Sequence, residues 1–166
     1  MNIESMDLEA ILGMAVKTET LGRQFYLNLS EKINNPEVRR KIQSLAEDEK
    51  RHQEIMENLY RKMIGKEPSE LPSKGVPDII RAIAALKIDD KTQVLDVLDM
   101  AIEAEAIATK FYMRGVSIAA DEKIRKVFEE LQREEEAHFN YLISEKSAIT
   151  ADFYWFSISD TAAMEE

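Results

Sequence analysis

Apolar residues recur every three or four positions along most of the chain, which is the spacing of a helix that buries one face. From about Ser5 to Ile33 this stripe consists of Leu8, Ile11, Leu12, Ala15, Gly22, Tyr26, Leu29 and Ile33. The same spacing predicts a second helix from Pro36 to about Met63, a third from about Thr92 to Ala119, and a fourth from Glu122 to about Ser144. The pattern therefore predicts an all-α chain with four long helices.

Polar residues, glycines and prolines mark the ends of these helices. Asn35, Pro36 and Glu37 supply an N-cap, a proline at the first helical position and an acid in the first turn. Asp121 is the predicted cap of the fourth helix. Residues about 65–91 have room only for one short helix, near residues 78–86, because the segment contains Gly65, Pro68, Pro72, Gly75 and Pro77. We expect this segment to be a long crossover between two helical hairpins.

The length and the apolar share of the chain predict one domain. An apolar share of 45% in 166 residues is enough for a single core. We assign residues 1–146 to the bundle and residues 147–166 to a C-terminal tail. The tail carries the aromatic cluster Phe153 to Phe156, for which packing is favoured over docking on a partner subunit or lining a site entrance.

The two halves of the chain repeat each other at a constant offset of 86 positions, without a gap. The segment Ala15 to Glu19 lies over Ala101 to Glu105. Three further pairs align in the same way, namely Phe25-Tyr26 with Phe111-Tyr112, Glu49 with Glu135, and His52 with His138. The repeat indicates that two helical hairpins were built from one pattern.

Charged residues occupy stripe positions that packing alone would fill with leucine. The stripes of the second and fourth helices run Ile42, Leu45, Glu49, His52, Met56 and Phe128, Leu131, Glu135, His138, Leu142. The stripes of the first and third helices each contain one carboxylate, Glu19 and Glu105. Four carboxylates and two imidazoles at one level of a core are prohibitively unfavourable unless cations compensate them.

The charge balance and the cysteine count limit what the protein can bind. The net charge of -10, from 22 basic and 32 acidic residues, repels phosphate backbones and anionic membranes. We therefore expect no nucleic acid and no membrane among its partners. The sequence shows no leader and no apolar run of membrane-spanning length, which predicts a cytoplasmic location. Because the chain has no cysteine, a bound metal must use oxygen and nitrogen ligands.

Two divalent cations would neutralise four carboxylates. One Glu from each of two helices, with a Glu-x-x-His from each of the other two, is the pattern of di-iron and di-manganese carboxylate bundles. We predict two iron ions as the cofactor, with manganese or a mixed pair as the alternative. The predicted metal ligands are Glu19, Glu49, His52, Glu105, Glu135 and His138. A metal-free bundle with these groups on solvated faces is the competing interpretation, and the matched positions of both histidines in the repeat argue against it.

Other polar residues near the predicted ligands carry less specific signals. Tyr26 and Tyr112 follow Glu19 and Glu105 by seven positions, so each hydroxyl can reach a ligand carboxylate and assist catalysis. Core packing with a satisfied hydroxyl explains both tyrosines equally well. The flanking acids are expected on a solvated, salt-bridged face, and they are Glu47, Asp48, Glu103, Glu134 and Glu136.

These motifs resemble the diiron domain of the rubrerythrins, which belong to the ferritin-like superfamily, over about Met6 to Ser144. The motif pair Glu49-Lys50-Arg51-His52 and Glu135-Glu136-Ala137-His138 is typical of ferritin-like carboxylate proteins. The sequence Ala-Ile-Glu-Ala-Glu at residues 101–105, followed by Phe111-Tyr112, is more similar to rubrerythrins than to storage ferritins. The resemblance implies a ferritin-like four-helix bundle of two repeated hairpins, in which ferrous iron reduces peroxide or dioxygen. It also implies that Glu49 and Glu135 bridge the two ions, while Glu19 and Glu105 are terminal ligands.

The sequence departs from typical rubrerythrins in two ways. Typical members carry a rubredoxin module with four cysteines, whereas this chain has none, so the resemblance implies an external electron donor, rubredoxin-like or another reductase. Typical members also have an additional Glu one turn after the third-helix ligand, where this chain has Ala108. A seventh ligand, which would be a fifth carboxylate, is therefore missing, and the small residues Gly22 and Ala108 leave space for a bound oxidant.

Four functions are compatible with these observations. The leading hypothesis is a diiron oxidoreductase that reduces peroxide or dioxygen with two Fe(II) ions and protects the cell from oxidative stress. The alternatives are a ferroxidase or iron-storage protein, a diiron oxygenase, and a metal-free structural bundle. A homodimer is the expected assembly, and the crossover is long enough to allow an exchange of hairpins between subunits.

Overall fold

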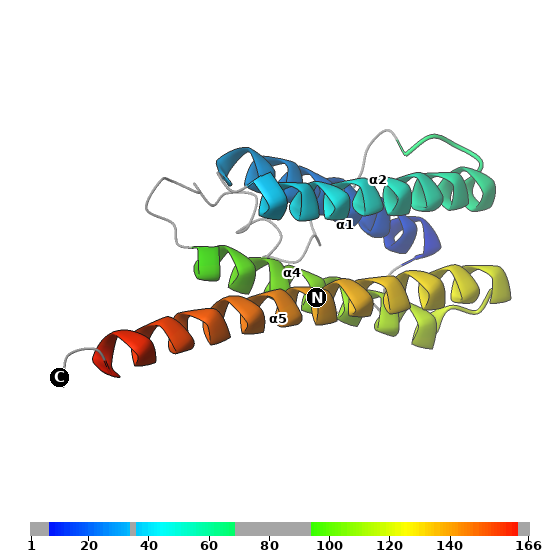
Figure 1. Ribbon diagram of the computed structural model, residues 1–166. Coiled ribbons are helices and arrows are strands. Elements are labelled where there is room, and N and C mark those ends of the chain that lie inside the picture. The colour runs from blue at the N-terminus through cyan, green and yellow to red at the C-terminus, as the bar shows by residue number, and fades with distance from the viewer. Residues whose placement is uncertain (1–6, 34–35, 69–93, 163–166) are drawn as a thin grey trace.

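The protein is described by a computed structural model that covers residues 7–33, 36–68 and 94–162. Its helices are α1 (Leu8–Lys32), α2 (Pro36–Ile64), α4 (Val94–Ile118) and α5 (Glu122–Ala162). They form two helical hairpins, α1 with α2 and α4 with α5, which lie side by side as a four-helix bundle (Figure 1). The predicted all-α, ferritin-like bundle of two hairpins is confirmed. Most of the predicted crossover, with its short helix, lies outside the described residues.

The helix ends follow from local chemistry. The Asp7 carboxylate accepts a hydrogen bond of 2.8 Å from the backbone N–H of Ala10, which caps α1. Pro36 is the first residue of α2, where its missing N–H costs no hydrogen bond. Gly65 ends α2 with a φ of 79°, and its N–H donates to the carbonyl of Arg61 at 2.9 Å.

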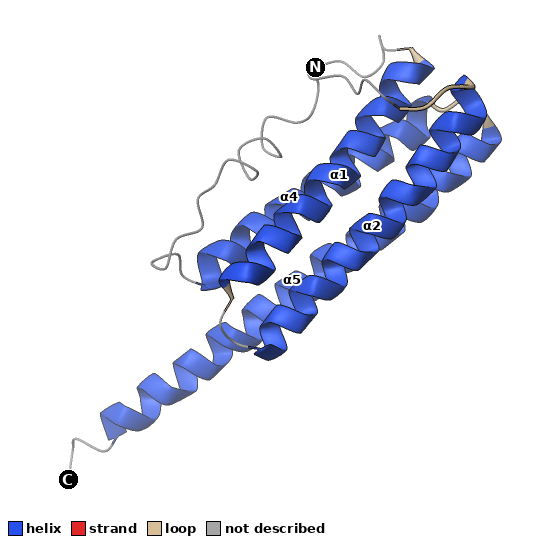
Figure 2. Cartoon of the chain, turned by 90° about the horizontal axis from the view of Figure 1, so that it is seen from above, coloured by secondary structure: helices blue, strands red, loops and turns tan. Residues whose placement is uncertain are grey.

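The fourth helix is longer than the sequence pattern predicts. Asp121 caps its start as expected, with Oδ1 accepting from the backbone N–H groups of Lys123 and Ile124 at 2.8 and 3.2 Å. The predicted end near Ser144 is wrong, because α5 continues to Ala162 and extends beyond the end of the bundle (Figure 2). No glycine or proline lies between these two positions, so nothing in the local sequence ends the helix once the apolar stripe stops.

The bundle interior consists of two apolar clusters separated by a polar layer. One cluster is built around Leu12, Met56, Tyr112 and Phe128, and the other around Phe25, Leu29, Leu45, Leu98 and Leu142. On every helix the residues of one cluster precede the polar layer and those of the other follow it. The polar layer is therefore closed at both ends by packed apolar side chains, which keep bulk water away from it.

The helices are arranged so that each contributes to this layer. Each helix packs extensively against its hairpin partner, while α1 also contacts α4, and α2 also contacts α5. Seen from above, the α1/α2 hairpin lies in front of the α4/α5 hairpin, with α4 behind α1 and α5 behind α2 (Figure 2). Within the described residues, no helix is long and apolar enough to cross a membrane.

Candidate metal centre

The structure brings the six predicted ligands together in the polar layer. Five of them are at most 4% exposed, and the His138 side chain is 12% exposed. Their ligand atoms form two groups in which all atoms lie within 4.8 Å of one another. One group contains Glu19, Glu49, His52 and Glu135, and the other contains Glu49, Glu105, Glu135 and His138. Glu49 and Glu135 are therefore shared by both groups, which is the arrangement of two bridging carboxylates between two metal ions.

Each histidine turns the same ring nitrogen toward the carboxylates. Nδ1 of His52 lies 2.9 Å from Glu135 Oε1 and 3.4 Å from Glu19 Oε2. Nδ1 of His138 lies 3.7 to 3.8 Å from oxygens of Glu49, Glu105 and Glu135. The two rings are stacked, with centroids 5.7 Å apart and an interplanar angle of 23°. Four helices thus contribute imidazole nitrogen and carboxylate oxygen to one compact cluster.

Several buried atoms in this cluster have no hydrogen-bond partner. They are Glu19 Oε2, both carboxylate oxygens of Glu135, and the Nδ1 atoms of His52 and His138. The atoms are close to one another but are not aligned for hydrogen bonding, as expected of groups that converge on a shared cation. Because an unpartnered buried charge is strongly unfavourable, this donor set fits two divalent metal ions. Mixed carboxylate and imidazole ligation suits iron or manganese.

The outer edge of each imidazole faces a carboxylate from the opposite hairpin. Nε2 of His52 lies 2.9 Å from Glu134 Oε2, and Nε2 of His138 lies 3.6 Å from Asp48 Oδ2. At His52 a proton on Nε2 is thereby directed to the Glu134 carboxylate, which leaves Nδ1 of the neutral ring free to bind metal, whereas the separation at His138 is too long for a hydrogen bond. As expected of a solvated, salt-bridged face, Asp48 and Glu134 are partly exposed and paired with Arg51, but each of them also faces an imidazole ring.

The sequence repeat relates these two carboxylates to each other, although it does not reveal their contacts with the histidines. Asp48 and Glu134 are equivalent in the repeat, and each directly precedes a shared ligand carboxylate, Glu49 or Glu135. On one helix, however, the residue before a buried ligand lies on a neighbouring face. The contact arises only because the facing helix brings its histidine to that side, so periodicity within one helix could not reveal it.

The two tyrosines donate hydrogen bonds across the bundle. The Tyr26 hydroxyl on α1 donates to Glu105 on α4, and the Tyr112 hydroxyl on α4 donates to Glu19 on α1. Burial is the largest cause that raises the pKa of both tyrosines well above the usual value, so both remain neutral donors. Each tyrosine therefore fixes the orientation of the terminal carboxylate supplied by the other half of the repeat.

Burial and mutual repulsion raise the pKa of three of the four carboxyl groups. Burial is the largest cause for Glu19, Glu49 and Glu105, and the charge of Glu135 is the next. The pKa of Glu105 rises to about 8. For Glu135 burial also acts to raise the pKa, but contacts with His138 and His52 outweigh it and lower the pKa below its ordinary value. Without metal, the cluster therefore keeps its negative charge mainly on Glu135.

Burial acts on the pKa of the two imidazoles in the opposite direction, because it disfavours their protonated, charged form. Burial alone would lower the pKa of His52, but Glu135 and Glu19 raise it to about 11. The pKa of His138 likewise rises to about 10 through Glu105 and Glu135, although burial opposes the shift. Both rings are therefore protonated at pH 7 in the absence of metal. Nδ1 can bind a cation only after its proton leaves, so protons compete with metal for this site.

We expect metal binding at pH 7 to release at least three protons, one each from His52, His138 and Glu105. Metal affinity should fall as the pH is lowered, since each raised pKa favours the protonated, metal-free form. Isothermal titration calorimetry with Mn²⁺ in two buffers of different ionisation enthalpy measures the number of protons released. A binding heat that does not depend on the buffer would contradict this electrostatic description.

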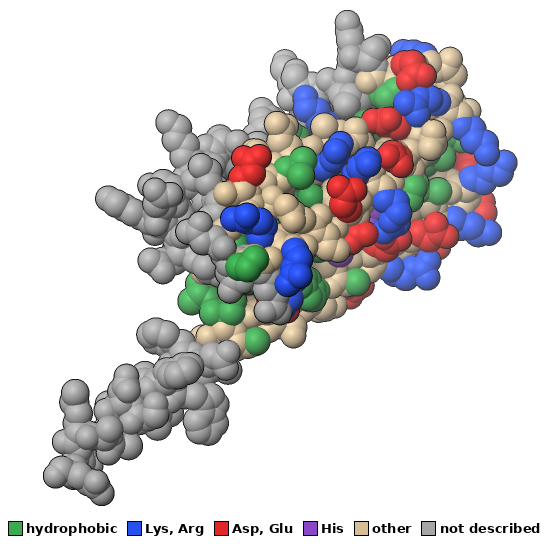
Figure 3. All heavy atoms as spheres, turned by 45° about the horizontal axis from the view of Figure 1, so that its top comes forward, with side chains coloured by type: hydrophobic (Ala, Val, Ile, Leu, Met, Phe, Trp, Pro, Cys, Tyr) green, Lys and Arg blue, Asp and Glu red, His purple; other side chains and the backbone are tan. Residues whose placement is uncertain are grey.

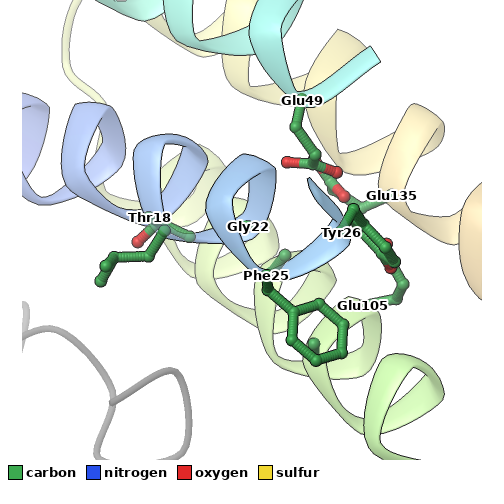
Figure 4. Close-up of a pocket in the computed structure, with 10 residues that line it drawn as sticks. Thr18, Gly22, Phe25, Tyr26, Glu49, Glu105 and Glu135 are labelled. Atoms are coloured by element: carbon green, nitrogen blue, oxygen red, sulfur yellow. The ribbon is translucent and has the colours of Figure 1, made fainter. Parts of the chain in front are cut away.

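A small pocket borders the cluster between α1 and α4. Its volume is about 30 Å³, and its lining includes Gly22, Ala108 and the carboxylates Glu49, Glu105 and Glu135. Figure 4 shows Glu49, Glu105, Glu135 and Tyr26 gathered next to the Gly22 segment of α1. The pocket has room for about one water-sized molecule. Gly22 and Ala108 occupy equivalent repeat positions, and their small size keeps this space free.

Gly22 also sets the position of a shared ligand. A Cβ atom at this position would lie 2.9 Å from Glu49 Oε2, which is too close. Because that oxygen ends a flexible side chain, we expect Gly22→Ala to displace the Glu49 carboxylate rather than unfold α1. Metal affinity should fall by about tenfold or more, as for other changes that reorient a metal ligand. Calorimetric titration measures the affinity, and melting in chelator shows whether the metal-free fold is unchanged.

A four-helix bundle with two overlapping Glu and His groups in its core defines a ferritin-like protein of the diiron-carboxylate type. The chain matches the rubrerythrin family over residues 10–146, and it belongs to that family. The uncharacterized protein YhjR of Bacillus subtilis (strain 168) is 27% identical over 138 residues, which cover 81% of this chain and 86% of YhjR.

A solved structure supports the same fold. A hypothetical protein from Pyrococcus furiosus superimposes with a TM-score of 0.74 at 28% identity, covering 90% of this chain and 94% of the other. The family typically binds iron, and the clustered carboxylates and histidines provide a site that could hold it. No rubredoxin-type centre can form within this chain, because it contains no cysteine.

Proposed function

We propose that the protein is a diiron oxidoreductase that uses two Fe(II) ions to reduce peroxide or dioxygen and so protects the cell from oxidative stress. The observation that supports this proposal is the pair of overlapping ligand groups that share Glu49 and Glu135 inside an apolar core. Four buried carboxylates match the charge of two divalent ions, and a shared pair of ligands holds both ions next to one small pocket.

The side chains of the cluster have distinct proposed tasks. Glu19 with His52 would hold one ion and Glu105 with His138 the other, while Glu49 and Glu135 would bind both. Two ferrous ions together supply two electrons, the number that converts one molecule of hydrogen peroxide and two protons into two molecules of water. Tyr26 and Tyr112 hold the terminal carboxylates in place, and we propose this orienting role for them rather than a direct chemical one.

The size of the pocket favours a small oxidant over an organic substrate. A free volume of about 30 Å³ beside the carboxylates accommodates a diatomic molecule or peroxide and not a carbon skeleton. This observation argues against the oxygenase alternative. Because the chain has no cysteine, we propose that electrons come from a separate rubredoxin-like protein or another reductase.

Anaerobic loading with ferrous iron tests the proposal. Peroxide added to the loaded protein should produce a ferric absorption band and should disappear much faster than with the same concentration of free ferrous ion. A variant that lacks both shared ligands, Glu49→Ala/Glu135→Ala, is the matched control and should behave like free iron. If the unmodified protein also behaves like free iron, the proposed oxidoreductase function is wrong.

Iron oxidation and storage is the second candidate, and one observation favours it. Ala108 stands where typical rubrerythrins have an additional Glu, so the cluster offers six ligand side chains. Storage requires a large hollow oligomer, whereas our proposal is a homodimer in the cytoplasm. Gel filtration with light scattering distinguishes the two, because a shell of many subunits would favour storage and a dimer would argue strongly against it.

A further inference from the structure

The two halves of the candidate metal centre are closed to different degrees on their outer side. The His52 side chain is fully buried at 0% exposure, whereas the equivalent His138 side chain is 12% exposed. Both belong to the same sequence repeat and present the same ring nitrogen to the cluster. The difference must therefore come from the residues that cover the outer edge of each ring.

Arg51 is the residue that covers the His52 side. Its guanidinium group forms an ion pair with Glu134, whose carboxylate also lies 2.9 Å from His52 Nε2. A second contact of 3.4 Å joins Arg51 to Asp48. The His52 ring is thus held from outside by an ion pair that links α2 to α5.

The repeat places a smaller residue on the His138 side. Ala137 is the equivalent of Arg51, and Asp48 is the equivalent of Glu134 with a side chain one methylene shorter. Asp48 Oδ2 lies 3.6 Å from His138 Nε2, a longer separation than on the His52 side. We call the Arg51–Glu134 ion pair the clamp of His52. Position 137 carries no guanidinium group, so the outer edge of the His138 ring has no equivalent clamp.

A groove lies where that clamp is missing. It runs between α2 and α5, has a volume of about 500 Å³, and is lined by Ser44, Leu45, Asp48, Ala137, His138 and Tyr141 among others. Arg40 and Lys41 also line the groove, and Lys41 is paired with Glu145 at 2.9 Å, which neutralises one of these two positive charges. Charged side chains of both signs are interspersed on the outer surface of the bundle (Figure 3). The groove is open space next to the His138 ring.

We propose that divalent metal ions enter and leave the centre through this α2/α5 groove, past His138, while the Arg51–Glu134 ion pair closes the corresponding route past His52. A ligand must leave its position before a buried ion can exchange, and only the His138 ring has free space on its outer side. Asp48 then offers a carboxylate at the groove end of the route. The ion held by Glu105 and His138 exchanges quickly, and the ion held by Glu19 and His52 exchanges slowly.

The experiment follows the release of Fe²⁺ from anaerobically loaded protein to an excess of a ferrous chelator. The unmodified protein should release its iron in two phases of one equivalent each. Glu105→Gln should remove the fast phase and Glu19→Gln the slow phase, which assigns the phases to the two halves. Release of both equivalents with a single rate constant would overturn the inference.

Two substitutions test the role of the clamp, one by adding an ion pair beside His138 and the other by removing the ion pair beside His52. Ala137→Arg at an exposed position should slow the fast phase by about threefold or more, the effect of one added ion pair with Asp48. Arg51→Ala should accelerate the slow phase by a similar factor. Ser117→Arg, which adds the same charge on α4 away from the groove, is the control and should change neither phase. Unchanged rates in both clamp variants would overturn the inference.

The inference rests on the proposed function only in requiring that two metal ions bind. The iron content of the loaded protein is therefore measured before release begins. If the unmodified protein binds no iron, the proposed function and this inference both fail. If it binds two equivalents whose release does not respond to the clamp variants, only the proposed route is wrong.

Discussion

Removing the two metal ions with a chelator should lower the melting temperature of this protein by about 15 °C or more. At a free metal concentration 1,000 times the dissociation constant, each bound ion stabilises the folded state by about 4 kcal/mol. In a chain of this size, each kcal/mol shifts the melting temperature by about 2–4 °C. The large effect has a direct structural cause, because Glu19, Glu49, Glu105 and Glu135 are all buried, and without the cations only the uptake of protons limits the repulsion among them.

Thermal denaturation followed by circular dichroism, with and without chelator, measures this shift at pH 7. The Glu49→Ala/Glu135→Ala variant is the control, since its melting temperature should not respond to the chelator. A melting curve of the unmodified protein that is insensitive to chelator would instead support the metal-free structural bundle.

Substitution of a shared carboxylate should damage metal binding far more than substitution of a terminal one. Glu135 belongs to both ligand groups, whereas Glu19 belongs to one. Glu135→Gln keeps the size of the side chain but removes a charge that both ions need. We expect its affinity for each ion to fall by more than about 100-fold, above the effect of changing a residue that only supports a ligand. Glu19→Gln should still bind one ion, held by Glu105 and His138.

Anaerobic calorimetric titration with Fe²⁺ or Mn²⁺ gives both the stoichiometry and the affinity. The expected series is two ions for the unmodified protein, one for Glu19→Gln, and none for Glu135→Gln at concentrations that saturate the others. Glu105→Gln is the matched partner of Glu19→Gln in the repeat and should also bind one ion. Equal losses in Glu19→Gln and Glu135→Gln would show that Glu135 is not a shared ligand.

The individual helices and the six ligand candidates could be predicted from the sequence for a simple reason. A helix repeats every 3.6 residues, so a residue's position in the sequence determines which face it occupies. Glu49 and His52 are three positions apart and therefore share a face with the apolar residues around them. The offset of 86 between the two halves then placed the same pattern in a second hairpin.

Contacts between helices could not be predicted in the same way. Tyr26 and Tyr112 were expected to reach ligand carboxylates, but their actual partners lie 79 and 93 positions away in the opposite half. Glu134 is partly exposed and salt-bridged as expected, but its additional contact with His52, 82 positions away in the sequence, was not predicted. Periodicity specifies the orientation of a residue about its own helix axis and contains no information on which neighbouring helix faces it.

The sequence alone thus determined that the chain forms long helices with four carboxylates and two histidines on their buried faces. The family resemblance implied that Glu49 and Glu135 are shared, but only the tertiary structure placed both of them in both ligand groups. It also decided that α5 continues to Ala162 and that Arg51 pairs with Glu134 beside His52, whereas Ala137 forms no such pair beside His138. The physical reason is that burial patterns act within each helix, whereas shared ligands and closed surfaces arise from the relative positions of helices in the packed bundle.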